Sequence, residues 1–161
     1  MFITAMKIKL NEPAPLFRLF NSEKQLVSLE NLKGQNILLL FFPAAFTSTC
    51  TQELCSVRDD LVYYNEMKTQ VFGISTDSVY SLKKYKQELK LNFELLSDFN
   101  KEVSELYGAC YELFNYGMKG VSKRAAFVID QSGLIRYAEV LDNANELPDI
   151  KRIRKTVESL R

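Results

Sequence analysis

The apolar run NILLLFF at residues 36–42 constrains the fold of this chain more than any other segment. An uninterrupted apolar run of strand length indicates a strand buried on both faces, whereas a half-exposed strand alternates apolar and polar residues. Pro43 follows the run and ends the strand, because proline has no backbone N–H to continue the ladder. A doubly covered strand needs layers on both sides of its sheet, so the chain is expected to be an α/β protein.

Strand and helix patterns alternate along the rest of the chain. In order, the expected elements are a hairpin-like segment at 17–29, the central strand, a helix from 48 to about 67, a strand at 70–76, a helix capped by Asp77 or Ser78, a short strand at 93–98, a short helix at 101–107, a hairpin of RAAFVID and LIRYAEV, and a charged helix at 146–161. This order resembles the thioredoxin-like arrangement, a mixed central sheet with helices on both faces. The chain shows no repeat or linker, so residues 1–161 are expected to form a single domain.

Charge and hydropathy argue against two classes of partner. Lysine and arginine total 21 against 20 for aspartate and glutamate, so no net field favours nucleic acid or an anionic membrane. The N-terminal stretch lacks the continuous apolar region of a secretion signal, and no window approaches 18 apolar residues. A cytoplasmic location is therefore expected.

The three cysteines, Cys50, Cys55 and Cys110, form an odd set that is too small for a disulfide framework at this length. The chain contains no histidine, which excludes a Cys-His or Ser-His nucleophile pair and a zinc site with histidine ligands. No cofactor or metal is expected. Any reactive thiolate must be stabilised by other groups.

Cys50 falls in the first turn of the helix expected from residue 48, just beyond the carboxyl end of the central strand. Open α/β sheets bind ligands at this edge, and the free N–H groups of a helix N-terminus favour a thiolate. Thr47 can direct its hydroxyl at the sulfur or at an incoming oxygen, while Pro43 fixes the turn. A free cysteine is often only a small buried side chain, but this setting favours a reactive one.

Pro43, Thr47 and Cys50 match the PxxxTxxC signature of the peroxiredoxins, and the similarity continues through FTSTCTQELC. Further segments also resemble this family, namely APLFRL, VFGISTDS, LLSDFNKEVSELYG and KRAAFVIDQSGLIRYAEV. The resemblance extends over roughly residues 7–160 in the same element order, and the chain is identified as similar to peroxiredoxins across nearly its whole length.

The resemblance implies a thiol peroxidase that reduces hydrogen peroxide and organic hydroperoxides. In this reading Cys50 is the peroxidatic nucleophile and becomes a sulfenic acid. Arg124, in SKRAAFVID, would stabilise the thiolate and orient the peroxide. Glu53 resembles the acidic residue that positions arginines in the family, and Arg58 matches less specifically.

The resemblance also bears on how the sulfenic acid is reset. Typical two-cysteine members carry a resolving cysteine near the C-terminus, and this chain has none after Cys110, so that class is excluded. Two types remain. Cys55 occupies the resolving position of the bacterioferritin comigratory protein or peroxiredoxin Q type, whereas MKGVSKRAAFVID at 118–130 resembles the one-cysteine alkyl hydroperoxide reductase E type. Cys110 is either a packing thiol or an alternative resolver, and thioredoxin or a glutaredoxin-like protein is the expected reductant.

Helix geometry constrains the Cys50–Cys55 pairing. Five residues of ideal helix rise about 7.5 Å and turn about 140°, which separates the Cα atoms by roughly 8.7 Å. A disulfide needs less than about 7 Å. The helix must therefore unwind locally before these two cysteines can pair.

Other functions and one assembly stay open at this point. A general thiol–disulfide oxidoreductase would suit the fold, but the chain lacks the usual CxxC. A redox-sensing module could use Cys50 only as a switch. A homodimer through loops around Phe42 and Phe46 is a further expectation.

Overall fold

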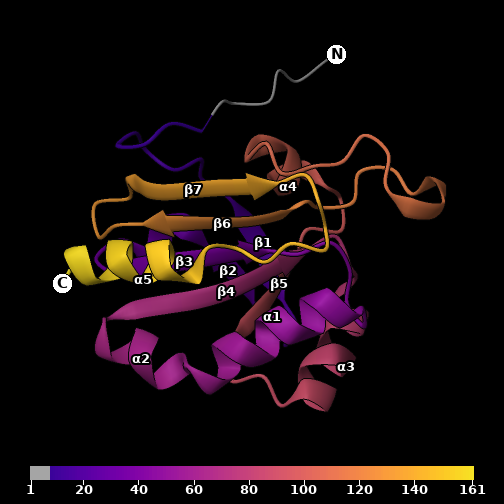
Figure 1. Ribbon diagram of the computed structural model, residues 1–161, viewed down its shortest axis with the longest axis horizontal. Helices are drawn as coiled ribbons and strands as arrows, with labels where there is room; N and C mark the ends of the chain where they lie inside the picture. The colour runs from indigo at the N-terminus through magenta and orange to yellow at the C-terminus, as the bar shows by residue number, and fades with distance from the viewer. Residues whose placement is uncertain (1–7) are drawn as a thin grey trace.

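The computed structural model describes residues 8–161. The first seven residues, on which the expectation about a secretion signal partly rests, lie outside the described residues. Within 8–161 the chain forms one seven-stranded sheet with helices packed against it (Figure 1). The elements in chain order are β1 (Arg18–Asn21), β2 (Leu26–Ser28), the 3-10 helix η1 (Leu29–Leu32), β3 (Asn36–Phe41), α1 (Ser48–Asp59), α2 (Leu61–Glu66), β4 (Thr69–Ser75), α3 (Val79–Leu89), β5 (Glu94–Ser97), α4 (Glu102–Leu106), the 3-10 helix η2 (Asn115–Gly117), β6 (Arg124–Ile129), β7 (Ile135–Leu141) and α5 (Ile150–Ser159).

The sheet is mixed, with the strand order β2-β1-β5-β4-β3-β6-β7. Strands β3, β4 and β5 run parallel to one another, whereas β6 pairs antiparallel with β3 and with β7. All six residues of β3 are buried. The apolar run is therefore the doubly covered central strand that the sequence predicts, and the thioredoxin-like mixed sheet is confirmed.

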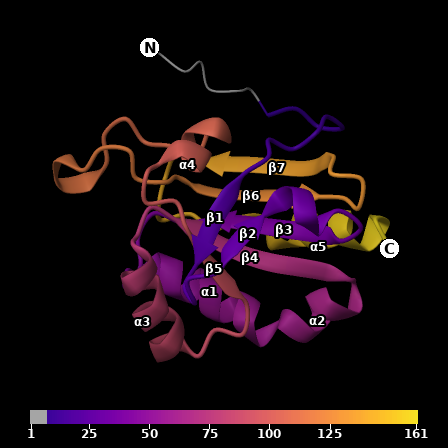
Figure 2. The same ribbon diagram turned by 180° about the vertical axis from the view of Figure 1, so that it is seen from behind.

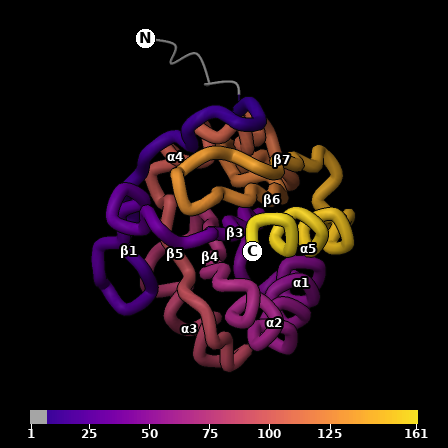
Figure 3. Tube along the Cα trace, turned by 90° about the vertical axis from the view of Figure 1, so that its left-hand side faces the viewer, coloured from indigo at the N-terminus to yellow at the C-terminus, as the bar shows by residue number. Residues whose placement is uncertain are grey.

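Two layers of helices cover the two faces of the sheet. Leu38 and Leu40 of β3 belong to the core that includes buried residues of α1, α2, α3 and α5. Leu39 and Phe41 point to the opposite face, where α4, η1 and the segment before β1 pack. Figure 3 shows the two layers along the sheet, and Figure 2 shows the arrangement from behind, with β1 and β2 toward the viewer.

Two helices differ from the sequence expectation. The helix expected at 48–67 is broken at Asp60, whose backbone lies at φ −101° and ψ 7°. Aspartate has a low helix propensity, and the Asp60 carboxylate accepts a hydrogen bond from Arg154 of α5. This contact with a segment distant in sequence favours the break in the helix at Asp60. The last helix begins at Ile150 rather than at 146, because Asp149 caps it by accepting from the Arg152 N–H at 3.2 Å.

The remaining expected elements are present, with ends shifted by a few residues. Ser78, and not Asp77, caps α3 with its side chain. No helix among residues 8–161 has both the length and the apolar character needed to cross a membrane.

Candidate active site

The candidate nucleophile Cys50 lies just past the carboxyl end of β3. Pro43 is buried at the end of this strand, and Thr47 is the extended residue from which α1 begins at Ser48. Cys50 therefore occupies the first turn of α1, as the sequence predicts. Its side chain is 1% exposed and packs with Leu54 on the buried face of the helix.

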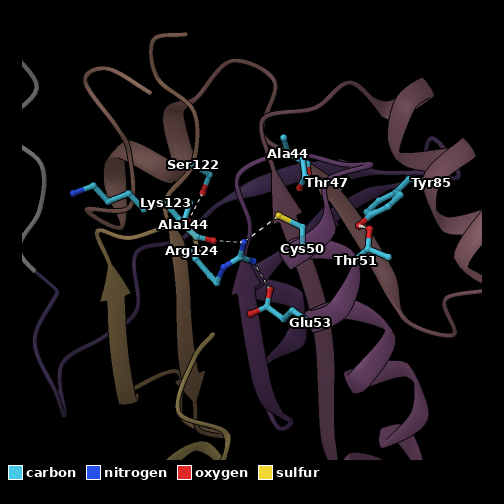
Figure 4. Close-up of polar contacts among 10 residues, drawn as sticks. All are labelled: Ala44, Thr47, Cys50, Thr51, Glu53, Tyr85, Ser122, Lys123, Arg124 and Ala144. Carbon is cyan, nitrogen blue, oxygen red and sulfur yellow. Dashed lines mark hydrogen bonds and ion pairs between the residues drawn. The ribbon is translucent and has the colours of Figure 1, made fainter. Parts of the chain in front are cut away.

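Arg124 brings a positive charge to this thiol. Its Nη2 donates to Cys50 Sγ at 3.2 Å and to the carbonyl oxygen of Ala144 at 2.9 Å, while its Nη1 donates to Glu53 Oε1 at 3.1 Å (Figure 4). The register of the sheet explains this position. Phe41 pairs with Ala125, so Arg124 lies one residue beyond the pairing, at the edge where β3 gives way to the Cys50 loop. The guanidinium is thus fixed on three sides.

The ion pair between Arg124 and Glu53 is buried, with the two side chains 1% and 2% exposed. Burial raises the pKa of Glu53 to about 7, although the charge of Arg124 opposes the shift and the more distant Glu139 adds to it. Burial alone would lower the pKa of Arg124, but the charges of Glu53 and Cys50 outweigh it and raise that pKa. Arg124 therefore stays charged, and a thiolate at Cys50 has a permanent cation beside it.

Thr47 lies above the sulfur, as Figure 4 shows, and its side chain is exposed. Its hydroxyl donates to the carbonyl oxygen of Ala44 at 2.6 Å, which leaves the hydroxyl oxygen able to accept a hydrogen bond from a bound peroxide. The Thr47 side chain does not cap α1. The first-turn N–H groups of α1 are thus left without a cap from Thr47, which favours negative charge there.

The other sequence-predicted residues lie outside this cluster. Cys55 is half-buried in α1, which runs unbroken through both Cys50 and Cys55, and all three cysteines are free thiols. Cys110 is half-buried in an isolated bridge with Ser122. Burial raises the pKa of Cys110, which makes its thiol a poor nucleophile at neutral pH. The Arg58 guanidinium donates to Asp59 and to the carbonyl oxygen of Leu89.

Two contributions to the site were missed by sequence reasoning. Asp77 accepts from the Ala45 N–H at 2.9 Å and from the Ser75 hydroxyl at 2.6 Å, so it fastens the loop before Cys50 to the end of β4. Its place directly after a strand parallel to β3 was the available signal. Ala144 acts through its backbone carbonyl, which no side-chain pattern reveals.

A metal site does not form within residues 8–161, because no group of three or more His, Cys, Asp or Glu side chains converges there. The chemistry that the cluster supports on its own residues is nucleophilic attack by a sulfur anion. The Arg124 guanidinium is placed to stabilise such an anion and to donate to an oxygen bound beside it, and the exposed Thr47 hydroxyl offers a hydrogen-bond acceptor.

Comparisons with known proteins show which chains and structures this protein resembles. The family described as AhpC/TSA matches residues 10–138. A putative peroxiredoxin bcp of Coxiella burnetii is 38% identical over 132 residues, which cover 81% of this chain and 87% of the relative. Alkyl hydroperoxide reductase E of Mycobacterium tuberculosis is also 38% identical, over 79% of this chain and 82% of its own length. The crystal structure of peroxidoxin BcpB from Mycobacterium tuberculosis superposes with a TM-score of 0.84 at 26% identity, covering 96% of this chain and 99% of that one.

Proposed function

The chain belongs to the AhpC/TSA family of peroxiredoxins, and on this premise we propose that it is a thiol-dependent peroxidase in which Cys50 is the peroxidatic nucleophile. The contact of Arg124 Nη2 with Cys50 Sγ at 3.2 Å, inside the core, carries the proposal. Arg124 is also paired with Glu53, but burial raises the pKa of Glu53 to about 7, so that carboxylate is only partly ionised at neutral pH and Arg124 can stabilise a second anion. The arrangement is understandable if the sulfur is negatively charged during the reaction.

The first step is attack of the Cys50 thiolate on one oxygen of hydrogen peroxide or of an organic hydroperoxide. An S–O bond forms and the O–O bond breaks, so the sulfur is oxidised and the peroxide is reduced. The departing oxygen takes a proton and leaves as water or an alcohol, and Cys50 is left as a sulfenic acid. Arg124 and Thr47 hold the peroxide oxygens during this step.

The second step in this proposal is resolution by Cys55. The Cys55 thiolate attacks the Cys50 sulfenic sulfur, an S–S bond forms, and the oxygen leaves as hydroxide that takes up a proton to become water. Because α1 is intact through both residues, its first turns must open before the sulfurs can meet. Thioredoxin or a glutaredoxin-like dithiol then reduces the disulfide.

A one-cysteine cycle is the second candidate, and a specific observation favours it. Cys55 is half-buried five residues farther along an unbroken helix, so α1 must unwind before Cys55 can reach Cys50, whereas an external thiol needs only access to the buried Cys50 sulfur. Cys110 is the third possible resolver. Its raised pKa makes it a slower nucleophile than an ordinary thiol.

Single-cysteine variants separate these cycles. Peroxide consumption with thioredoxin should be lost in Cys50→Ser, whereas Cys55→Ser should retain one rapid turnover and then stall. Cys110→Ser is the matched control and should cycle like the unaltered protein. Mass spectrometry without reductant should find a Cys50–Cys55 peptide after one equivalent of peroxide.

Two results would contradict parts of the proposal. Equal peroxide consumption by the unaltered protein and Cys50→Ser would exclude Cys50 as the nucleophile and favour a general oxidoreductase or a sensing module. A persistent sulfenic acid at Cys50, with no disulfide peptide, would establish the one-cysteine cycle instead.

The proposed homodimer needs a correction at one residue. Phe42 is fully buried and contacts the core, so it is not available to a second copy. Phe46 is 54% exposed and stays the candidate contact. A Phe46→Ala variant that sediments like the unaltered protein would argue against this interface.

A further inference from the structure

The first turn of α1 is fastened on the side away from Arg124. Thr51 follows Cys50, and its Oγ1 lies 2.8 Å from the hydroxyl oxygen of Tyr85 in α3 (Figure 4). Tyr85 is buried, at 1% exposed. Burial raises the pKa of Tyr85 to about 12, with the Cys50 and Cys55 sulfurs contributing in the same direction, so the phenol is protonated at neutral pH. The hydrogen bond therefore joins two neutral hydroxyls, one of them on the residue that follows Cys50.

Tyr85 also contacts the loop that leads into α1. The ring of Phe46 packs against the ring of Tyr85 with centroids 4.9 Å apart and ring planes inclined at 52°. Phe46 has a φ of 65°, a left-handed backbone conformation that is uncommon for an aromatic residue. A loop held in such a conformation relaxes when its contacts are lost. One tyrosine thus holds both segments that flank Cys50.

Helix periodicity ties this contact to Cys55. Thr51 and Cys55 are four residues apart in α1 and so lie on one face of the helix. Cys50 points to the other side, where Arg124 holds its sulfur. For Cys50 to reach Cys55, the turn that contains Thr51 must unwind, and this breaks the Thr51–Tyr85 hydrogen bond.

We propose that Tyr85 and Thr51 are positioning residues that hold the first turn of α1 closed and set how often Cys50 is released toward Cys55. The closed turn keeps Cys50 beside Arg124 for attack on peroxide, and the open turn allows the disulfide to form. The effect on disulfide formation rests on the proposed function, because it requires Cys55 to be the resolving cysteine. The contacts that keep the turn closed do not depend on that function.

The sulfenic acid at Cys50 can either form the disulfide or be oxidised further, so the contacts that keep the turn closed affect which product forms. While the turn stays closed, a second peroxide can oxidise the Cys50 sulfenate to a sulfinate, with a new S–O bond and release of water or an alcohol from the cleaved O–O bond. A weaker hold should therefore give more disulfide and less sulfinic acid at the same peroxide concentration.

Hydrogen–deuterium exchange tests the hold without any peroxide chemistry. Tyr85→Phe and Thr51→Val are each made in a Cys50→Ser background, and Tyr107→Phe is the matched control, since its hydroxyl donates to the carbonyl oxygen of Pro15 on the other face of the sheet. Exchange of the backbone amides at 51–54 should rise about fivefold in both test variants and stay unchanged in the control. Amides of α5 should not change.

Disulfide formation tests the consequence in protein that retains its three cysteines. After one equivalent of peroxide, the rate of appearance of the Cys50–Cys55 peptide should rise about fivefold in Tyr85→Phe and Thr51→Val. The sulfinic fraction in excess peroxide should fall in the same two variants.

The outcomes separate the two proposals. Unchanged exchange at 51–54 in both variants, or an equal rise throughout the protein, overturns the hold. Faster exchange with an unchanged rate of disulfide formation overturns its role in release. Faster exchange with no disulfide in any variant supports the hold and overturns resolution by Cys55.

Discussion

Replacement of Glu53 by glutamine tests whether desolvation or the ion pair with Arg124 dominates in the buried site. Burial raises the pKa of Glu53 from 4.5 to about 7. Between these values the folded state binds more protons than the unfolded state, so the free energy of unfolding falls as pH rises, by up to ~1.4 kcal/mol per pH unit. The stabilising contribution is complete below pH 4.5 and is lost as the pH rises through about 7.

The magnitude follows from the two pKa values. Integrated from pH 5 to pH 8, the titration of Glu53 lowers the stability of the unaltered protein by about 2.5 kcal/mol. Glu53→Gln lacks this titration. The pKa of about 7 already includes the attraction of Arg124, so the pH-dependent part of the ion pair is contained in this titration. The remaining effects of the substitution vary little with pH and cancel when the two pH values are compared. The stability of Glu53→Gln relative to the unaltered protein should therefore rise by about 2.5 kcal/mol from pH 5 to pH 8.

Urea unfolding followed by circular dichroism measures this difference, since the chain contains no tryptophan to serve as a fluorescence probe. The same pair of proteins in a Cys50→Ser background removes any contribution from the ionisation of the thiol. A difference that is the same at pH 5 and pH 8 would refute the burial argument. A difference of the opposite sign would mean that Arg124 outweighs desolvation and that the pKa of Glu53 is lowered.

Two further substitutions test the site and the core. Arg124→Lys should slow the oxidation of Cys50 by peroxide about a hundredfold, because one ammonium cannot reach Cys50, Glu53 and Ala144 together as the guanidinium does. Stopped-flow kinetics measure this rate. A change below about threefold would contradict the role of the guanidinium. Gly73→Ala should lower the free energy of unfolding by about 1–3 kcal/mol, because its Cβ would lie 2.7 Å from Leu95 Cδ2 and 3.3 Å from Phe42 Cε1. Unchanged urea unfolding would show that Leu95 can move aside.

Much of the fold could be predicted because it is encoded in local patterns. The apolar run before Pro43 indicates β3, and the spacing of Cys50, Leu54 and Val57 indicates the buried face of α1, as the structure confirms. The break at Asp60 was not predictable in the same way. The helical pattern continues through it, and the break depends on Arg154 from α5.

The candidate site likewise combines residues that local sequence patterns predict with contacts that depend on the tertiary structure. Pro43, Thr47 and Cys50 are neighbours in sequence, so the order of strand, loop and helix places them together. Arg124 could be nominated from its motif, but its contact with Cys50 follows from the pairing of β6 with β3. The resolving role of Cys55 stays a prediction.

The sequence by itself determined the central strand, the loop after it and the helix that begins before Cys50, because these features depend on periodicity and on the chemistry of neighbouring residues. Only the tertiary structure decided which groups surround the sulfur. Arg124 lies at 3.2 Å because Phe41 pairs with Ala125 in the sheet, and Tyr85 reaches Thr51 because α1 and α3 pack on one face. Such contacts join residues tens of positions apart, and they depend on strand order, register and burial of the whole chain rather than on any local pattern.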